Sequence, residues 1–430
     1  MARTILSAAT IFDGSDAAPF EGDVIVDDGR ITSVSKSEAA PRRSDAAGPE
    51  VRVIDAKGLF LMPGMVDGHS HLSFENVAQP DDLVKPPPEE HTLLTARVAK
   101  LLLDQGFTSA YSASEAKLRL AVAIRNEVDA GRLPGPRIRA GSLEISVTGG
   151  MGDESRMHYP KGGASIIVDG PEEMRKAVRT ACREGCDNIK LDVSGDPFYP
   201  GAPASSTPMS FEEVKIAVDT AHSFGRKVNA HTRSAHGTKL CVRAGVDTLF
   251  HLEYGDEEMF DLLEQAKDRV IVAPSVALMH TMLNDAAPFG ITKEVAQHMG
   301  MSDLLESSIK THSELRKRGI KHVIGGDYGL LFAPNGTNAR DIQHFVDYYG
   351  YTPAQALVCA TRNGGLMFYG DGSLGTIRPG SHADILLVNG NPLKDLNLLV
   401  NAENLLLIMK GGQIHKNTTG TAARTQRSAA

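Results

Sequence analysis

The middle of the chain alternates short apolar segments with longer amphipathic ones, and this alternation restricts the fold more than any other feature. It is typical of repeated β/α units, in which helices cover a parallel sheet. Helices are expected at Pro88–Gln105, Pro171–Glu184 and Ser210–Phe224, because each segment begins with residues that suit a first helical turn. The expected strands are Leu61–His69, Thr108–Ser112, Arg137–Ala140, Asn188–Val193, Lys227–His231, Thr248–His251, Val270–Ala273 and His322–Gly326.

This set of strands predicts a closed (β/α)8 barrel, the TIM barrel, within the α/β class. A doubly wound open sheet shows the same alternation. Eight units with candidate ligands at the strand ends nevertheless favour the closed barrel, which gathers its active site at those ends. We expect the barrel to occupy residues 61–371.

Both ends of the chain have short alternating segments broken by turns, which is typical of small antiparallel strands. We expect residues 1–60 and 372–415 to pair into one small β-sandwich, and residues 416–430, which lack periodicity, to be a disordered tail. The expected strands of the sandwich are Thr4–Leu6, Gly22–Val26, Arg30–Val34, Val51–Asp55, Ala383–Val388, Asn404–Met409 and Gly412–His415.

Composition and charge argue against several classes of partner. A net charge of -8 provides no basic surface for nucleic acid or anionic lipid, so we expect neither as a partner. No run of residues approaches the roughly 18 to 20 apolar residues of a membrane helix. The apolar run at Ile5–Phe12 is too short and too polar for a signal peptide, so a cytoplasmic protein is expected. We expect the cysteines to be free thiols: Cys182, Cys186, Cys241 and Cys359.

The first chemical signal is the segment Pro63-Gly-Met-Val-Asp-Gly-His-Ser-His-Leu, which ends an expected strand with His69 and His71. Side chains two apart on a strand project from the same face, so two imidazoles can bind one ion there. Ordinary polar residues also end strands, and the pair is weak evidence when taken alone. The case is strengthened by further candidates at the ends of later strands, namely Lys190, His231, His251 and Asp327.

Together these motifs resemble the amidohydrolase superfamily, in the branch that includes imidazolonepropionase-like enzymes, Xaa-Pro and other dipeptide hydrolases, and ochratoxin amidases. The later motifs read Asn-Ile-Lys-Leu-Asp, Val-Asn-Ala-His-Thr, Thr-Leu-Phe-His-Leu and Ile-Gly-Gly-Asp-Tyr. The resemblance spans nearly the whole chain. Even the closing segment from Leu374 to Leu387 is similar to the one in which that family returns from barrel to sandwich.

The resemblance implies a binuclear metal centre. His69 and His71 would hold the more buried metal, and His231 and His251 the more exposed one. Asp327 would bind the buried metal and act as the general base. The metals would lower the pKa of bound water and polarise the scissile carbonyl. Four imidazoles with carboxylate-type oxygens suit Zn best, with Mn, Fe or Co as alternatives.

Lys190 would bridge the two metals in this scheme. A free ammonium has no lone pair for a metal, so the bridge requires carboxylation of the lysine to N6-carboxylysine, whose carbamate supplies two anionic oxygens. The alternative is an ordinary lysine at a strand end, paired with Asp192 or Asp196.

The implied reaction is hydrolysis of a C–N bond in a small molecule, either an amide of the N-acyl amino acid or dipeptide type, a urea or a carbamate. The alternative enzyme is a deaminase or cyclic amidohydrolase acting on a heterocycle, and Lys190 argues against it because such deaminases often lack the bridging lysine. A non-catalytic barrel that serves only in assembly would have lost several ligands, whereas all six positions are filled here. Large barrels of this type often associate, so a homo-oligomer is expected.

Two departures from the family pattern concern the substrate. Relatives usually carry Thr-Gly-Gly-His-Gly-Asp, whose histidine helps to polarise the substrate carbonyl, and this chain has Met151 at that position, which cannot donate the hydrogen bond. Tyr111 stands where relatives commonly carry Arg-Asp, and we expect it to face the pocket. Arg233, His236 and Tyr254 follow ligand-bearing strands and are further candidates for substrate contact, although helix capping or salt bridging would explain them equally well.

The loops near Met151 also look apolar and aromatic. They would suit an aryl or alkyl substituent, or the same side chains could simply pack the loops together. The residues concerned are Met157, Tyr159, Phe198 and Tyr199.

Overall fold

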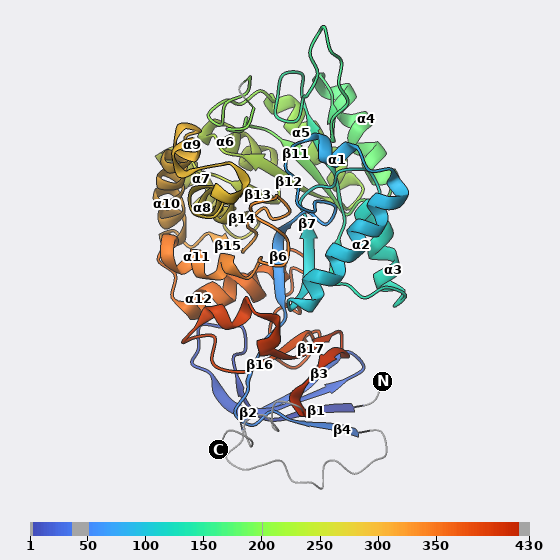
Figure 1. Ribbon diagram of the computed structural model, residues 1–430, viewed down its shortest axis with the longest axis vertical. Coiled ribbons are helices and arrows are strands. Elements are labelled where there is room, and N and C mark those ends of the chain that lie inside the picture. Colours follow the sequence, from blue (N-terminus) through green and yellow to red (C-terminus); the bar gives the residue numbers. More distant parts are fainter. Residues whose placement is uncertain (1–2, 37–50, 200, 421–430) are drawn as a thin grey trace.

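The computed structural model describes residues 3–36, 51–199 and 201–420 (Figure 1). Strands of the central barrel are surrounded by helices, and a separate sheet lies at the lower end of the view, where both ends of the chain meet. The predicted α/β fold, a TIM barrel with a β-sandwich built from the two ends, is confirmed.

Parallel strands form the wall of the barrel, in the order in which they occur along the chain. They are β6 (Met65–Ser70), β7 (Phe107–Ser112), β8 (Arg137–Arg139), β9 (Gly141–Ser146), β11 (Asn188–Asp192), β12 (Lys227–Thr232), β13 (Thr248–His251), β14 (Ile271–Ala273) and β15 (Lys321–His322). β8 pairs with β7 while β9 pairs with β11, so β8 and β9 are two parts of the third barrel strand. The short strand β10 (Ser165–Ile167) extends the sheet beside β9.

Two glycines allow the first and last strands to approach and close the barrel. The N–H of Gly68 donates to the carbonyl of Ile324 at 2.8 Å. A Cβ on Gly68 would lie 2.5 Å from Cγ2 of Val323, and a Cβ on Gly325 would lie 2.5 Å from the backbone nitrogen of His69. Any side chain at either position would therefore force the two strands apart next to His69.

Helices pack around this barrel, and the apolar side chains between the two layers form the main core. The helices predicted from sequence are confirmed to within a residue or two at each end, and α5 begins with a capping box formed by Ser210 and Glu213. The longer helices are α2 (Pro88–Asp104), α3 (Leu120–Asp129), α4 (Gly170–Arg183), α5 (Phe211–Ser223), α6 (Ala235–Ala244), α7 (Glu257–Gln265), α8 (Val276–Asn284), α10 (Met301–Lys317) and α11 (Arg340–Tyr349). Shorter ones are α1 (Asp81–Val84), α9 (Lys293–His298), α12 (Pro353–Val358) and α13 (Gly364–Leu366).

The second sheet joins the two ends of the chain in the order β18-β17-β16-β5-β1-β2-β3, with β4 beside β1. Its strands are β1 (Arg3–Ile11), β2 (Phe20–Asp27), β3 (Arg30–Lys36), β4 (Val51–Asp55), β5 (Phe60–Pro63), β16 (Ile385–Val388), β17 (Leu405–Lys410) and β18 (Gln413–Asn417). Most pairs are antiparallel as expected, but β4 and β5 run parallel to β1. Buried residues from both ends of the chain, such as Leu6, Leu61 and Leu407, share one core.

Some details of the sequence prediction were wrong. The expected strand Leu61–His69 is divided at Gly64, because β5 pairs with the second sheet while β6 pairs with β7 in the barrel. The segment expected to be a tail from residue 416 begins within β18, and residues 421–430 of that tail lie outside the described residues.

Two other expectations concern the cysteines and membranes. All four cysteines are buried and unpaired, as predicted. Within the described ranges, no helix has the length and apolar character needed to cross a bilayer.

Candidate metal centre

The six predicted ligands come together at the carboxyl ends of the barrel strands. His69 lies in β6 and His71 follows it, while His231 and His251 lie in the neighbouring strands β12 and β13. Because the strands are parallel, their carboxyl ends meet at one face of the barrel. Lys190 reaches this face from β11, and Asp327 reaches it from the segment after β15.

The distances within this group are short. Ligand atoms of His69, His251 and Asp327 all lie within 4.8 Å of one another. Oδ1 of Asp327 is 2.9 Å from Nε2 of His71 and 3.7 Å from Nε2 of His69. The ring centroids of His231 and His251 are 4.3 Å apart. Five of the six predicted ligands therefore converge on a small volume.

Neighbouring groups orient the histidine rings. Nδ1 of His69 is 2.7 Å from the hydroxyl of Ser275, and Nδ1 of His71 is 3.0 Å from the carbonyl oxygen of Ser114. A carbonyl only accepts, so Nδ1 of His71 carries the proton and Nε2 is left facing Asp327. Such partners fix the tautomer and the ring direction of a metal-binding histidine.

Burial and nearby charges together determine the protonation of the candidate ligands. It lowers the pKa of His69, His231 and His251 well below the usual value, so these imidazoles are neutral and present a lone pair. Burial also opposes protonation of His71, but the hydrogen bond and charge of Asp327 outweigh it and raise the pKa of His71. Burial would likewise raise the pKa of Asp327, yet the histidines hold it well below its usual range, and the group is a carboxylate.

Lys190 is buried among acidic groups. Its Nζ lies 3.4 Å from Oε1 of Glu144, 3.6 Å from Oδ1 of Asp192 and 5.6 Å from the centre of the Phe250 ring. Burial lowers the pKa of Lys190, but the two carboxylates outweigh this and raise it overall. These are the contacts of an unmodified lysine, so the pairing with Asp192 considered from sequence is present, whereas Asp196 is paired with Arg233.

Several buried polar atoms at this face make no hydrogen bond within the described part of the chain. They include Nδ1 of His251 and both carboxylate oxygens of Asp192. Buried polar atoms nearly always make hydrogen bonds, so buried polar atoms that make none beside converging imidazoles suit a site that can hold a cation. The donor set of imidazole nitrogens and carboxylate oxygens fits a divalent metal.

The backbone is strained at the same place. His251, Ser275 and Asp327 all have positive φ values, of 78°, 58° and 64°. For residues other than glycine this conformation costs roughly 1–3 kcal/mol each, and it persists only where the surrounding structure enforces it. The rest of the barrel therefore holds two candidate ligands and the partner of a third in fixed, unfavourable positions.

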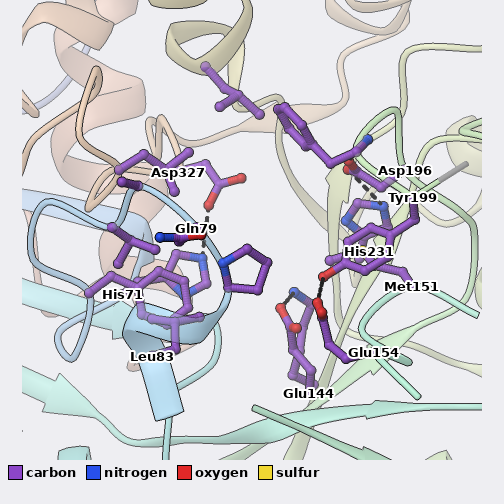
Figure 2. Close-up of a pocket in the computed structure, with 18 of the residues that line it drawn as sticks. His71, Gln79, Leu83, Glu144, Met151, Glu154, Asp196, Tyr199, His231 and Asp327 are labelled. Atoms are coloured by element: carbon purple, nitrogen blue, oxygen red, sulfur yellow. Dashed lines mark hydrogen bonds and ion pairs between the residues drawn. The ribbon is translucent and has the colours of Figure 1, made fainter. Parts of the chain in front are cut away.

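A cavity of about 480 Å³ opens above the ligands (Figure 2). The apolar part of its lining, called the apolar side below, consists of Phe74, Val77, Pro80, Leu83, Leu278, Leu330 and Phe332. The more polar part, called the polar side, consists of Glu144, Met151, Asp153, Glu154, Arg156, Asp196, Phe198 and Tyr199. In Figure 2, His71, Leu83 and Asp327 face Met151, Tyr199 and His231 across the open space. The candidate metal site thus forms the floor of a pocket large enough for a small molecule.

Of the residues predicted to contact substrate, only Met151 lines this cavity. Tyr111 instead packs in a buried apolar cluster, with its ring centroid 6.4 Å from that of Phe368. Arg233 is buried between Asp196, at 2.9 Å, and Glu253. The expectation that Tyr111 faces the pocket was therefore wrong, and Arg233 makes the salt bridges that were considered as the alternative to substrate contact.

His236 and Tyr254 also lie outside the cavity wall. His236 is exposed in the first turn of α6, and Tyr254 is half-buried against the main core. Both follow ligand-bearing strands, but the chain has already turned into a helix or loop that carries them away from the ligands. Met157 and Tyr159 are exposed as well, whereas Phe198 and Tyr199 do line the pocket.

Sequence reasoning missed the residue nearest to Lys190. Glu144 lies in β9, in the second half of the third barrel strand, and lines the cavity. The prediction ended that strand at Ala140, although the alternation of Leu143 and Ile145 with polar residues is a strand signal that would have extended it. Ser114 and Ser275, which orient His71 and His69, follow barrel strands but carry no signal of their own in the sequence.

Comparisons with known proteins agree with this architecture. The amidohydrolase family matches residues 60–415. Ochratoxinase from Aspergillus niger is 28% identical over 437 residues, which cover 96% of this chain and 86% of that protein. Its solved structure superimposes with a TM-score of 0.83 and 25% identity, over 97% of this chain and 96% of that chain.

Two more distant structures share the fold. A Xaa-Pro dipeptidase with bound methionine has a TM-score of 0.84 at 24% identity, over 97% of this chain and all (100%) of the other. Molinate hydrolase has a TM-score of 0.73 at 20% identity, over 96% and 94% of the two chains. The chain belongs to the amidohydrolase family, and it is a hydrolase that acts on amide-type C–N bonds.

Proposed function

We propose that the protein is a binuclear metal-dependent hydrolase that cleaves the C–N bond of a small amide, urea or carbamate. The observation that carries this proposal is the convergence of His69, His251 and Asp327 within 4.8 Å at the floor of a cavity. Lys190, His71 and His231 complete the set around them. In this proposal His69 and His71 would hold the more buried metal and His231 and His251 the more exposed one, with Zn as the first choice and Mn, Fe or Co as alternatives.

When bound, the metals would supply a water of lowered pKa and a polarised scissile carbonyl. The residues of the chain do the rest. Asp327 is a carboxylate that is 21% exposed toward the cavity, so it can take a proton from the attacking water and deliver it to the leaving nitrogen. Ser275 and Ser114 keep the rings of His69 and His71 in place during this transfer.

Lys190 is proposed to act as N6-carboxylysine, a bridge between the two metals. Its side chain is only 2% exposed and extends toward the ligand face from β11. Carboxylation would replace the ammonium by an anionic group, so the contacts of Lys190 with Glu144 and Asp192 would have to change. A metal pair beside it would offset the accumulated negative charge.

The shape of the cavity indicates the type of substrate. Its apolar side, with Phe74, Leu83 and Phe332, suits an aryl or alkyl group. A Xaa-Pro dipeptidase, which by its name acts on a dipeptide, is among the proteins that the chain resembles. We therefore place N-acyl amino acids and dipeptide-like amides first, and ureas and carbamates second.

Amine release tests this proposal. Protein loaded with zinc or manganese in the presence of bicarbonate would be incubated with N-acyl amino acids, dipeptides, aryl ureas and carbamates. Release of an amine from at least one of these classes is expected. Release of ammonia from heterocycles, with none of these compounds cleaved, would contradict the proposal and support the deaminase alternative.

A further inference from the structure

Glu144 is a partly exposed carboxylate beside the floor of the cavity. It lines the polar side next to the metal floor, and its side chain is 17% exposed, so part of the carboxylate faces the open space. Oε1 lies 3.2 Å from the hydroxyl of Ser114, and Oε2 lies 3.3 Å from the hydroxyl of Ser165. These two hydroxyls donate to the carboxylate and hold it in one orientation.

The other acidic groups on this side are already engaged. Arg233 pairs with Asp196 at 2.9 Å, and Lys161 pairs with Glu154 at 3.2 Å. The hydroxyl of Tyr199 also donates to Glu154. Asp153 also lines the cavity, and its two oxygens accept the backbone N–H groups of Gly149 and Ser155. These carboxylates therefore have little capacity left for a ligand.

Glu144 differs because its cationic partner is Lys190, at 3.4 Å. If Lys190 is carboxylated, as proposed above, it no longer offers an N–H donor with a positive charge. Glu144 would then keep its two serine hydrogen bonds but lose the charge that balances it. A partly buried carboxylate without a cation costs free energy, and a donor from a ligand would remove that cost.

We propose that Glu144 determines substrate specificity by accepting a hydrogen bond from an α-amino group, two bonds from the scissile carbonyl carbon, so that the enzyme prefers amino-acyl amides and dipeptides with a free amine. This inference rests on the proposed function, because it requires carboxylated Lys190 and a carbonyl held at the metal floor. With the scissile carbonyl at the metal floor, the α-amino group would also lie close to that floor. Glu144 lines the cavity at the same place. The apolar side of the cavity takes the rest of the substrate.

A matched pair of substrates tests the inference. Alanyl 4-nitroanilide and propionyl 4-nitroanilide share the leaving group and differ only by the α-amino group. We expect wild-type protein to favour the alanyl compound in kcat/KM by roughly 10-fold to 100-fold, as for a hydrogen bond to a charged group. Glu144→Gln keeps the size of the side chain and should reduce this preference by about 10-fold or more. Glu154→Gln, at a carboxylate that is already engaged, should leave the preference unchanged.

Binding provides a second readout that does not need turnover. In the Asp327→Asn background, calorimetric Kd values for the two anilides should show the same preference, and adding Glu144→Gln should remove it. Equal Kd values for the two anilides in that background would overturn the inference even if neither compound is cleaved. Failure of the proposed function would appear separately, as an absence of amine release from every amide, urea and carbamate tested.

Metal content distinguishes substrate recognition by Glu144 from metal ligation by Glu144. If Glu144 were a metal ligand, Glu144→Gln would lower the number of metals per chain. We expect the metal content of Glu144→Gln and Glu154→Gln to match that of the wild type. A loss of metal confined to Glu144→Gln would overturn the inference and make Glu144 part of the metal centre.

Discussion

Two neighbouring regions of the barrel are both buried but are built from different chemistry. The proposed metal-binding face consists of histidines, Lys190 and Asp327, with left-handed backbone and, within the described ranges, buried polar atoms that make no hydrogen bond. The adjacent apolar cluster contains Val66, Tyr111, Phe250, Val323 and Leu374, which are buried, uncharged and packed together.

Phe250 joins the two regions, since its ring stacks on His69 with the centroids 3.9 Å apart. Strain and unpaired polar atoms cost stability, whereas buried apolar contacts provide it. The apolar cluster therefore offsets the cost of holding His69 and the neighbouring candidate ligands in place. Substitutions in the two regions should therefore have separable effects, on turnover and metal binding in one and on unfolding in the other.

The largest effect is expected from Asp327→Asn. The change removes the proposed base while keeping the size of the side chain, so kcat should fall by about 10²- to 10⁴-fold. Thermal unfolding and metal content, measured on the same samples, should stay close to the wild type. Near-normal kcat would show that another group moves the proton.

Leu374→Ala tests the other region. Leu374 is 1% exposed in the apolar cluster, so truncation should lower the free energy of unfolding by about 2–5 kcal/mol. Denaturant titration measures this loss, and metal content per folded chain should not change. Leu93→Ala is a matched control, because Leu93 is 66% exposed and its truncation should have little effect. An equally large loss in the control would contradict the distinction.

Ser275 is expected to have an intermediate effect. Removing its hydroxyl frees the ring of His69, and loss of such a partner typically lowers metal affinity about 10- to 100-fold. Ser275→Ala and Ser275→Gly should both show this in a competition titration with a chelator. The glycine variant also relieves the backbone strain at φ 58°, so normal affinity in that variant alone would assign the effect to the backbone.

The smallest effect is expected from Tyr111→Phe. Burial raises the pKa of the Tyr111 phenol, which keeps its proton, and within the described residues its oxygen makes no hydrogen bond of ordinary geometry. Removing the hydroxyl should change the free energy of unfolding by less than about 1 kcal/mol. KM and kcat should remain as in the wild type, whereas a large rise in KM would return Tyr111 to the substrate pocket.

Much of the fold could be predicted from the sequence because the spacing of apolar residues and the ends of apolar strands are local signals. The alternation of strands and helices identified the barrel, and the ligands followed from polar residues where apolar strands end. The third strand was cut short at Ala140 because the strand is interrupted there, and the division at Gly64 depends on which sheet each half joins.

The walls of the pocket could not be predicted in the same way. Phe74, Leu83 and Phe332 lie in loops or in a short helix, and only the folded chain brings them together over the metal face. Tyr111 lies inside β7, and Arg233 directly follows β12, so both are close to strand ends in the sequence. Position in the sequence therefore placed Tyr111 and Arg233 near the site, while the structure gives one to the apolar cluster and the other to a buried ion-pair network.

If the six residues hold two metals, the metal content per chain measures this directly. The protein would be produced with zinc or manganese and bicarbonate, and compared with Lys190→Gln by elemental analysis. About two metals per wild-type chain, and a clear loss in Lys190→Gln, are expected for a site bridged by carboxylated lysine. One metal or none in the wild type, or the same metal content in both proteins, would contradict a two-metal site bridged by carboxylated Lys190.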